Sequence, residues 1–270
     1  MNEMRTNDEM LKIYKLHESE GRVGQPYILH YYVGDCNLTF FGSVHTADPE
    51  SPQWNILEDE WSKFTKSENP KKILIFEKSG SNVDGLDRRG AIIEHGETGL
   101  ALWLAEKNSV DTLSPQRSNA DAIKTLQAQG YTTKEIMTYY FARQMHQWAR
   151  QDKEIAPNWE LYMEDTIKHY NDLDCWGEDL SLVKTLDWFV EESGKEFDEH
   201  DISTFYNISD PSQNPVSAES GKQQDIALHN EIQKQISLGK DVFVVYGSGH
   251  AIRLEPVLDD EYQKTVIKSE

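Results

Sequence analysis

Hydrophobic residues along this chain fall into short runs and longer periodic stretches, a pattern that predicts both strands and helices. Two runs, 27–33 and 38–44, are separated by the turn residues 34–37, Gly-Asp-Cys-Asn, which favour a β-hairpin. From 54 to 66, apolar residues recur every three or four positions, the spacing of an amphipathic helix. A further apolar run, 72–77, ends in an acidic residue. The first part of the chain is therefore expected to form a hairpin, a helix and a buried strand.

The remaining pattern predicts strands joined by helices. A strongly apolar helix is expected over 98–106 and leads to a short strand at 110–113. A helix over 225–238 precedes the apolar run 241–246, and a closing helix follows at 252–262. Strand, helix, strand is the order of a parallel crossover. We therefore predict an α/β fold with a mostly parallel central sheet flanked by helices.

Long helical periodicity, rich in aromatic residues, replaces this alternation from about 117 to 200. We interpret this block as an α-helical insertion or cap within a single α/β domain that spans 25–270. Residues 1–24 are polar and predict a loosely held N-terminal arm.

Composition narrows the class of protein. With 47 acidic and 27 basic side chains, the formal charge is -20, so the chain repels the phosphates of nucleic acids and anionic lipids. No apolar run approaches the 18 residues of a membrane span. The two cysteines, Cys36 and Cys175, fit reduced thiols better than a disulfide framework. We expect a soluble, cytoplasmic protein that binds neither nucleic acid nor membranes; the sequence leaves its oligomeric state open.

The pattern Gly-Ser-x-His occurs twice, at 42–45 and 247–250, each time directly after a predicted strand. Glycine lets the backbone turn sharply, and ligands of open α/β sheets bind beyond the carboxyl ends of the strands. His45 and His250 are therefore the leading candidates for function. Ser43 and Ser248 are expected to bind substrate or backbone rather than act as nucleophiles, because neither lies in Gly-x-Ser-x-Gly.

Two acids occupy comparable positions. Glu77 ends the strand at 72–77, and Glu97 opens the helix predicted over 98–106. Both also have structural interpretations: Glu77 could cap a helix or pair with Lys78, and Glu97 could interact with the helix dipole. The neighbouring Glu94 and His95 are expected in an exposed loop.

Imidazole and carboxylate groups are ligands that first-row divalent ions accept. We predict that His45, His250 and Glu97 bind a divalent metal such as zinc, manganese or cobalt. The metal would make a bound water acidic enough to attack near neutral pH, and Glu77 would take the proton. No local signature such as His-Glu-x-x-His supports this site, since its residues are far apart in the sequence.

These motifs resemble those of a known family. The first Gly-x-x-His, a strand ending in glutamate, Gly96-Glu97 at a helix start and Val-Phe-Val-Val-x-Gly-x-Gly-His at 242–250 are similar to the TraB/Tiki-like proteins of the erythromycin esterase/ChaN-like superfamily. The resemblance spans about 40–258, is strongest at 240–250 and is absent through the helical block. It implies that His45 and His250 are the motif histidines and that Glu97 and Glu77 are the acids.

The resemblance implies several activities. Tiki-type members are metal-dependent proteases, esterase members use histidine and glutamate to hydrolyse a lactone ester, and ChaN-type members bind haem. Family members often place an arginine and an aspartate at the head of the helix before the last strand. Here Gln223-Gln224-Asp225 offers the aspartate alone, and Asp225 is expected to bind substrate.

The leading prediction is a metal-dependent hydrolase that cleaves a peptide or ester bond in a peptide or small-molecule substrate. One alternative is metal-free hydrolysis by histidine and glutamate, as in the erythromycin esterases. Another is a non-catalytic protein that binds haem or a different small ligand, with the histidines as axial ligands of the haem iron.

Overall fold

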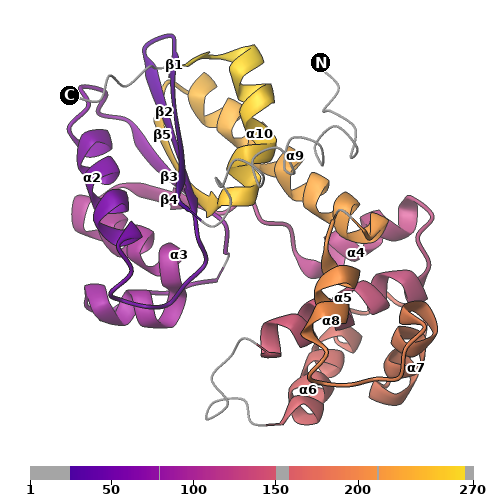
Figure 1. Ribbon diagram of the computed structural model, residues 1–270. Coiled ribbons are helices and arrows are strands. Elements are labelled where there is room, and N and C mark those ends of the chain that lie inside the picture. The colour runs from indigo at the N-terminus through magenta and orange to yellow at the C-terminus, as the bar shows by residue number, and fades with distance from the viewer. Residues whose placement is uncertain (1–24, 79, 150–157, 212, 265–270) are drawn as a thin grey trace. The chain divides into compact units, whose positions relative to one another are not determined.

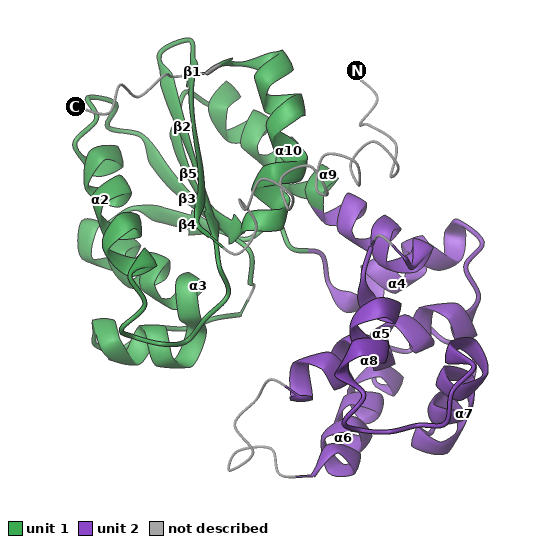
Figure 2. Ribbon diagram, viewed as in Figure 1, with its two compact units in different colours: residues 1–116, 225–270 green, residues 117–224 purple. Residues whose placement is uncertain are grey.

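Figure 1 shows a computed structural model of the protein. It describes residues 25–78, 80–149, 158–211 and 213–264, so the predicted N-terminal arm lies outside the described residues. The chain divides into two compact units (Figure 2). Unit 1 comprises residues 1–116 and 225–270, and unit 2 comprises residues 117–224. The helical insertion predicted over about 117–200 falls within unit 2.

In the described part of unit 1, six strands form one sheet in the order β4-β3-β5-β2-β1-β6. Their bounds are β1 Tyr27–Val33, β2 Cys36–Ser43, β3 Lys72–Phe76, β4 Asp111–Leu113, β5 Asp241–Gly247 and β6 Gln263–Lys264. The four strands from β4 to β2 are parallel, whereas β1 and β6 are antiparallel to their neighbours. The predicted α/β fold with a largely parallel sheet is therefore confirmed.

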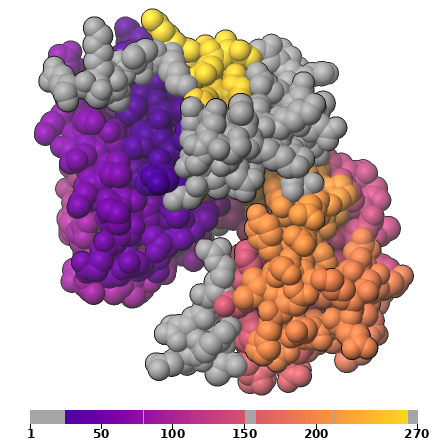
Figure 3. Space-filling view, viewed as in Figure 1, coloured from indigo at the N-terminus to yellow at the C-terminus, as the bar shows by residue number. Residues whose placement is uncertain are grey.

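Helices cover both faces of this sheet (Figure 1). One face carries α2 (Gln53–Thr65) and α3 (Arg88–Asn108), and the other carries α10 (Ser248–Glu261) and the part of α9 (Pro215–Ser237) that belongs to unit 1. Because side chains alternate along a strand, Phe243 of β5 enters the core under α2 and α3, whereas Val244 enters the core under α9 and α10. Figure 3 shows the α2 and α3 side as an indigo-to-purple surface.

Three helices begin earlier than the sequence pattern predicts, and one of them is the closing helix predicted from 252, which is α10 and begins at Ser248. The helix predicted from 225 starts at Pro215, where the side chain of Asn214 accepts hydrogen bonds from the amides of Val216 and Ser217. Proline at the first helical position and asparagine before it are both favourable start signals. The helix predicted from 98 is the second part of α3, which is interrupted by a non-helical Gly96.

In its described residues, unit 2 is helical. It contains α4 Asn119–Ala128, α5 Thr133–Ala149, α6 Trp159–Asn171, α7 Leu182–Ser193, α8 Ile202–Ser209 and the first part of α9. The aromatic residues of this block form its cores: Tyr140 packs against Tyr170, and Phe141 packs against Phe189. Their periodicity therefore reflects packing rather than a cofactor site.

None of the helices described in either unit has the length and apolar character that crossing a bilayer requires.

Candidate active site at the carboxyl edge of the sheet

Three neighbouring parallel strands deliver the candidate residues to one edge. The central strand β5 has β3 on one side and β2 on the other. His45 follows β2, Glu77 follows β3, and His250 lies in the first turn of α10 directly after β5. Since parallel strands end at a common edge, residues far apart in sequence meet there.

His45 is paired with Glu97. Its Nδ1 is hydrogen-bonded to Glu97 Oε1, which comes from the buried start of the second part of α3. The Glu97 carboxylate raises the pKa of His45 through this hydrogen bond. The His45 side chain is 57% exposed, so its free ring nitrogen, Nε2, can reach solvent or a substrate.

The position of Glu97 depends on Gly96. This glycine has φ 57°, and a Cβ there would lie 2.8 Å from the carbonyl oxygen of Thr46. Because of the positive φ and this short distance, a residue with a Cβ would fit at position 96 only if the backbone moved. The kink ends the first part of α3 and restarts the helix with Glu97 in its first turn, beside the loop that carries His45.

His250 is paired with Asp225 in a similar way. Its Nδ1 is hydrogen-bonded to Asp225 Oδ1, and the carboxylate of Asp225 is fully buried in α9. Arg253 donates to both oxygens of Asp225, at 2.6 and 3.2 Å. Arg253 and the histidine hold the pKa of Asp225 below its usual value against the effect of burial. Burial and the charge of Arg253 would lower the pKa of His250, but the charge of Asp225 and the hydrogen bonds to Asp225 and Glu77 together outweigh them and raise that pKa to about 9.

Glu77 lies between the two histidine pairs. Its Oε2 accepts a hydrogen bond of 2.9 Å from the amide of Gly247, and its Oε1 lies 3.7 Å from Nε2 of His250. Although burial would raise its pKa, His250, His45 and the Gly247 amide together lower it strongly. Glu77 is therefore ionised at neutral pH.

Gly247 lets His45 approach this group. A Cβ at residue 247 would lie 2.7 Å from Nε2 of His45 and 3.5 Å from Oε2 of Glu77. Any larger residue would therefore occupy the space between the imidazole and the strand end. Each histidine thus binds a carboxylate through Nδ1 and leaves Nε2 beside Gly247 or Glu77, as in the carboxylate–histidine pairs of many catalytic and metal sites.

The other predicted site residues have different surroundings. Ser43 is buried and donates to the carbonyl oxygen of Tyr246, so its hydroxyl links β2 to β5. Ser248 is half-buried at the first position of α10. Asp225, predicted to bind substrate, is buried against His250 and Arg253, and its contacts there are those of a residue that positions His250.

Glu94 and His95 lie on α3 rather than in the loop that the sequence predicted. Nε2 of His95 is 2.9 Å from the carbonyl oxygen of Asn82, and the Glu94 side chain is 55% exposed. In the described part of the chain, neither residue takes part in the hydrogen bonds that hold His45, His250 and Glu77.

The sequence interpretation missed Arg253. The family pattern predicts an arginine next to Asp225 in the sequence. The guanidinium that contacts Asp225 instead belongs to Arg253 of α10, three residues after His250. Residues three apart lie on the same face of a helix, so the spacing from His250 was the available signal.

The predicted metal ligands are only partly arranged as a ligand set. Glu97 is occupied by His45 Nδ1, and among the described residues no group of three or more His, Cys, Asp or Glu side chains is placed to hold a metal ion. The donors left facing the site are Nε2 of His45, Nε2 of His250 and the carboxylate of Glu77. Their chemistry fits a divalent ion with two imidazole ligands and one carboxylate ligand.

Comparison of the chain with family models, with curated proteins and with solved structures finds no match. The resemblance to the TraB/Tiki-like proteins therefore stays a prediction carried by the motifs themselves.

Proposed function

We propose that unit 1 is a hydrolase that cleaves an ester or peptide bond in a small molecule or peptide. The observation that carries this proposal is the convergence of two carboxylate-bound imidazoles, His45 and His250, on Glu77 at the carboxyl edge of the sheet. Such an arrangement supplies a proton acceptor, a cation and an anion close to Gly247.

His45 is the group that moves the proton. In its neutral form it donates from Nδ1 to Glu97 and accepts at Nε2. As a water oxygen attacks the carbonyl carbon, Nε2 takes a proton from that water. When the bond to the leaving oxygen or nitrogen breaks, the imidazolium returns the proton to the leaving group. Glu97 stabilises the imidazolium between these steps.

His250 supplies positive charge. With a pKa of about 9 it is protonated at neutral pH, and its Nε2 faces the site. We infer that it stabilises the negative charge that develops on the carbonyl oxygen. Glu77 remains ionised, orients the attacking water and balances the charge of both imidazoles. Asp225 is a positioning residue because it acts on the site through His250, and Arg253 holds the carboxylate of Asp225.

A divalent metal remains part of the proposal. His45, His250 and Glu77 would hold it once they had moved closer together and His250 had lost its proton, and Glu97 would orient His45 instead of binding the ion directly. When bound, the ion would polarise the carbonyl group and lower the pKa of water. Zinc, manganese and cobalt all accept such ligands.

The deciding experiment is elemental analysis of the purified protein and of a His45→Ala/His250→Ala variant, each dialysed against zinc, manganese and cobalt. Ester and peptide panels are then screened with and without a chelator. Near-stoichiometric metal in the parent alone, with activity lost on chelation, supports the metal-dependent reaction. Activity that resists chelation but is lost in the variant supports hydrolysis by histidine and glutamate.

Ester and peptide cleavage that is unchanged in the double variant would refute both forms of the proposal. An absorption spectrum after addition of haem tests the remaining alternative: a Soret band that is lost in the same variant would indicate a haem-binding protein.

A further inference from the structure

One buried hydroxyl at the carboxyl edge of the sheet lacks a partner within the described part of the chain. Tyr246 precedes Gly247 at the end of β5 and is only 2% exposed. Among the described residues its hydroxyl makes no hydrogen bond. A buried phenol normally has a partner, because an unpaired polar group away from water is costly. This hydroxyl therefore favours a ligand that provides the missing partner.

The tyrosines of β1 that pack in the same core do have partners. The hydroxyl of Tyr31 donates to Asp259 at 2.7 Å, and that of Tyr27 donates to Glu255 at 2.6 Å. Both acceptors lie on α10. Tyr246 differs from these two tyrosines, since no carboxylate near it accepts from its hydroxyl.

Tyr246 lies beside two residues of the proposed active site. Its ring packs edge-on against the imidazole of His250, with the ring centroids 5.4 Å apart and an interplanar angle of 82°. Phe76 of β3 pairs with Val245 of β5, so the next residue of each chain segment, Glu77 and Tyr246, are neighbours at the strand ends. The unpartnered phenol therefore belongs to the same edge as the two histidine pairs.

The phenol of Tyr246 stays protonated there. A tyrosine hydroxyl has an ordinary pKa of about 10 and is neutral at pH 7. Burial raises the pKa of Tyr246, and the negative charges of Glu77 and Asp225 raise it further. Tyr246 therefore offers a neutral O–H donor rather than a phenolate.

The proposed reaction has use for such a donor. A carbonyl oxygen that becomes an oxyanion is stabilised by several hydrogen bonds at once, and tyrosine is one of the residues that provide them. His250 has only Nε2 to offer, because its Nδ1 is bound to Asp225, and Oε1 of Glu77 lies 3.7 Å from that Nε2. A second donor beside His250, without an acceptor of its own, would complete the stabilisation.

We propose that Tyr246 is a further catalytic residue, whose hydroxyl donates to the carbonyl oxygen of the substrate beside Nε2 of His250. This role rests on the proposed hydrolase activity and applies with or without a bound metal ion. The carbonyl oxygen gains negative charge as water adds to the carbon and loses it when the bond to the leaving group breaks. Tyr246 keeps its proton throughout. The hydrogen bond is strongest in the tetrahedral intermediate, so it accelerates the reaction rather than only binding the substrate.

The test compares Tyr246→Phe with the parent, as full chains, on two probes. One is para-nitrophenyl acetate, and the other is para-nitrophenyl methylphosphonate, a stable tetrahedral anion of similar shape. Phenylalanine keeps the ring that packs against His250 and removes only the hydroxyl. We expect kcat for the ester to fall about 100-fold while KM stays within about threefold. Inhibition by the phosphonate should weaken at least about tenfold.

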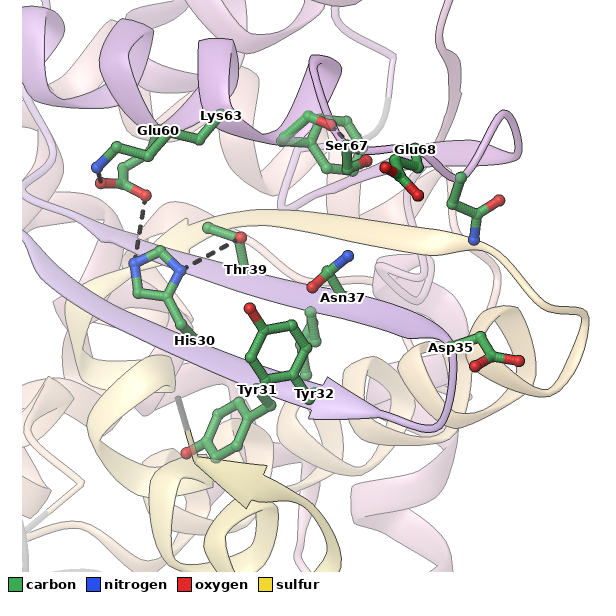
Figure 4. Close-up of a pocket in the computed structure, with 13 residues that line it drawn as sticks. His30, Tyr31, Tyr32, Asp35, Asn37, Thr39, Glu60, Lys63, Ser67 and Glu68 are labelled. Atoms are coloured by element: carbon green, nitrogen blue, oxygen red, sulfur yellow. Dashed lines mark hydrogen bonds and ion pairs between the residues drawn. The ribbon is translucent and has the colours of Figure 1, made fainter. Parts of the chain in front are cut away.

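Tyr31→Phe is the matched control. It removes the same hydroxyl from a buried tyrosine of the same core. Tyr31 pairs with Leu38 near the start of β2, whereas Tyr246 pairs with Gly42 near the end of that strand. Figure 4 labels Tyr31 among the residues that line a pocket in that region. The control should keep kcat and inhibition by the phosphonate within about twofold of the parent, because its hydroxyl is far from the reacting atoms.

The His45→Ala/His250→Ala variant separates a failure of this role from a failure of the proposed function. If that variant is inactive while Tyr246→Phe matches the parent in kcat and in inhibition by the phosphonate, the hydrolase stands and the role of Tyr246 is overturned. A raised KM with unchanged kcat also overturns it, because the hydroxyl would then bind substrate and transition state equally. A parent that does not cleave the ester, or a double variant that cleaves it equally fast, contradicts ester hydrolysis and this role together.

A second measurement covers the case in which Tyr246→Phe does not fold. The parent is labelled at the hydroxyl-bearing carbon of its tyrosines and titrated with the phosphonate by NMR. One tyrosine signal should shift saturably as its hydroxyl gains an acceptor, and this shift should persist in Tyr31→Phe. Tyrosine signals that do not move would overturn the role of Tyr246.

Discussion

Asp225→Asn is the sharpest test of the charge arrangement at the proposed active site. Asp225 is fully buried, and its charge is the largest of the causes that raise the pKa of His250 against burial, beside the hydrogen bonds to Asp225 and Glu77. The asparagine retains the shape of the side chain but loses the charge. We therefore expect the pKa of His250 to fall from about 9 to below the 6.5 of a free imidazole.

The size of the effect follows from the two pKa values. The difference between about 9 and 6.5 corresponds to about 3 kcal/mol of preference for the protonated ring, at about 1.4 kcal/mol for each pH unit. Because the folded-state pKa is raised, this stabilisation is fully present below pH 6.5. It is lost as pH rises through about 9. In Asp225→Asn this loss of stability over the alkaline range should disappear.

The assay is a histidine NMR titration of His250 in the parent and the variant, with Asp111→Asn as an exposed control from the same unit. The control should leave the titration unchanged. A His250 pKa near or below 6.5 in the parent, or one still near 9 in Asp225→Asn, would refute the reasoning. In the second case the field at His250 would have to come from Glu77, which lies 3.7 Å from its other nitrogen.

Three further substitutions test the geometry. Glu97→Gln should lower the pKa of His45. Because His45 must be deprotonated to accept a proton, the acidic limb of the rate–pH profile should then move to lower pH. An unmoved limb would contradict the role of His45 as proton acceptor. Gly247→Ala should reduce hydrolysis at least about tenfold with little change in thermal stability, since its Cβ would lie 2.7 Å from Nε2 of His45; Gly221→Ala, whose Cβ meets nothing within 4 Å, is the control, and equal rates in both would argue against the site. Gly96→Ala should destabilise the protein by about 1–3 kcal/mol in chemical denaturation, because φ is 57° and the Cβ would meet a backbone oxygen at 2.8 Å; an unchanged midpoint would be inconsistent with the kink.

The sequence predicted the strand ends of the site well because hydrophobic runs and glycine are local signals. A few neighbouring residues are enough to predict the strand or turn that precedes each of His45, Glu77 and His250. Once the sheet is parallel, their meeting at one edge follows from the topology.

The carboxylate partners of the two histidines could not be predicted from neighbouring residues in the same way. Glu97 reaches His45 because Gly96 breaks α3, and a glycine inside a helical pattern does not reveal whether it kinks the helix. Asp225 lies in the interior of α9 because that helix starts at Pro215, so it does not head a helix as the family pattern suggested. The depth of its burial, which fixes its role, depends on packing between distant segments.

The two Gly-Ser-x-His motifs produce similar pairs with different exposure, and this difference separates their roles. The His45 side chain is 57% exposed, so its ring can exchange a proton with water or substrate during a reaction. The His250 side chain is 11% exposed and is held by a buried carboxylate that also binds Arg253, so its charge is fixed. In the reaction that we propose, the repeated motif thus provides one mobile proton from His45 and one positive charge on His250, with the ionised Glu77 beside them.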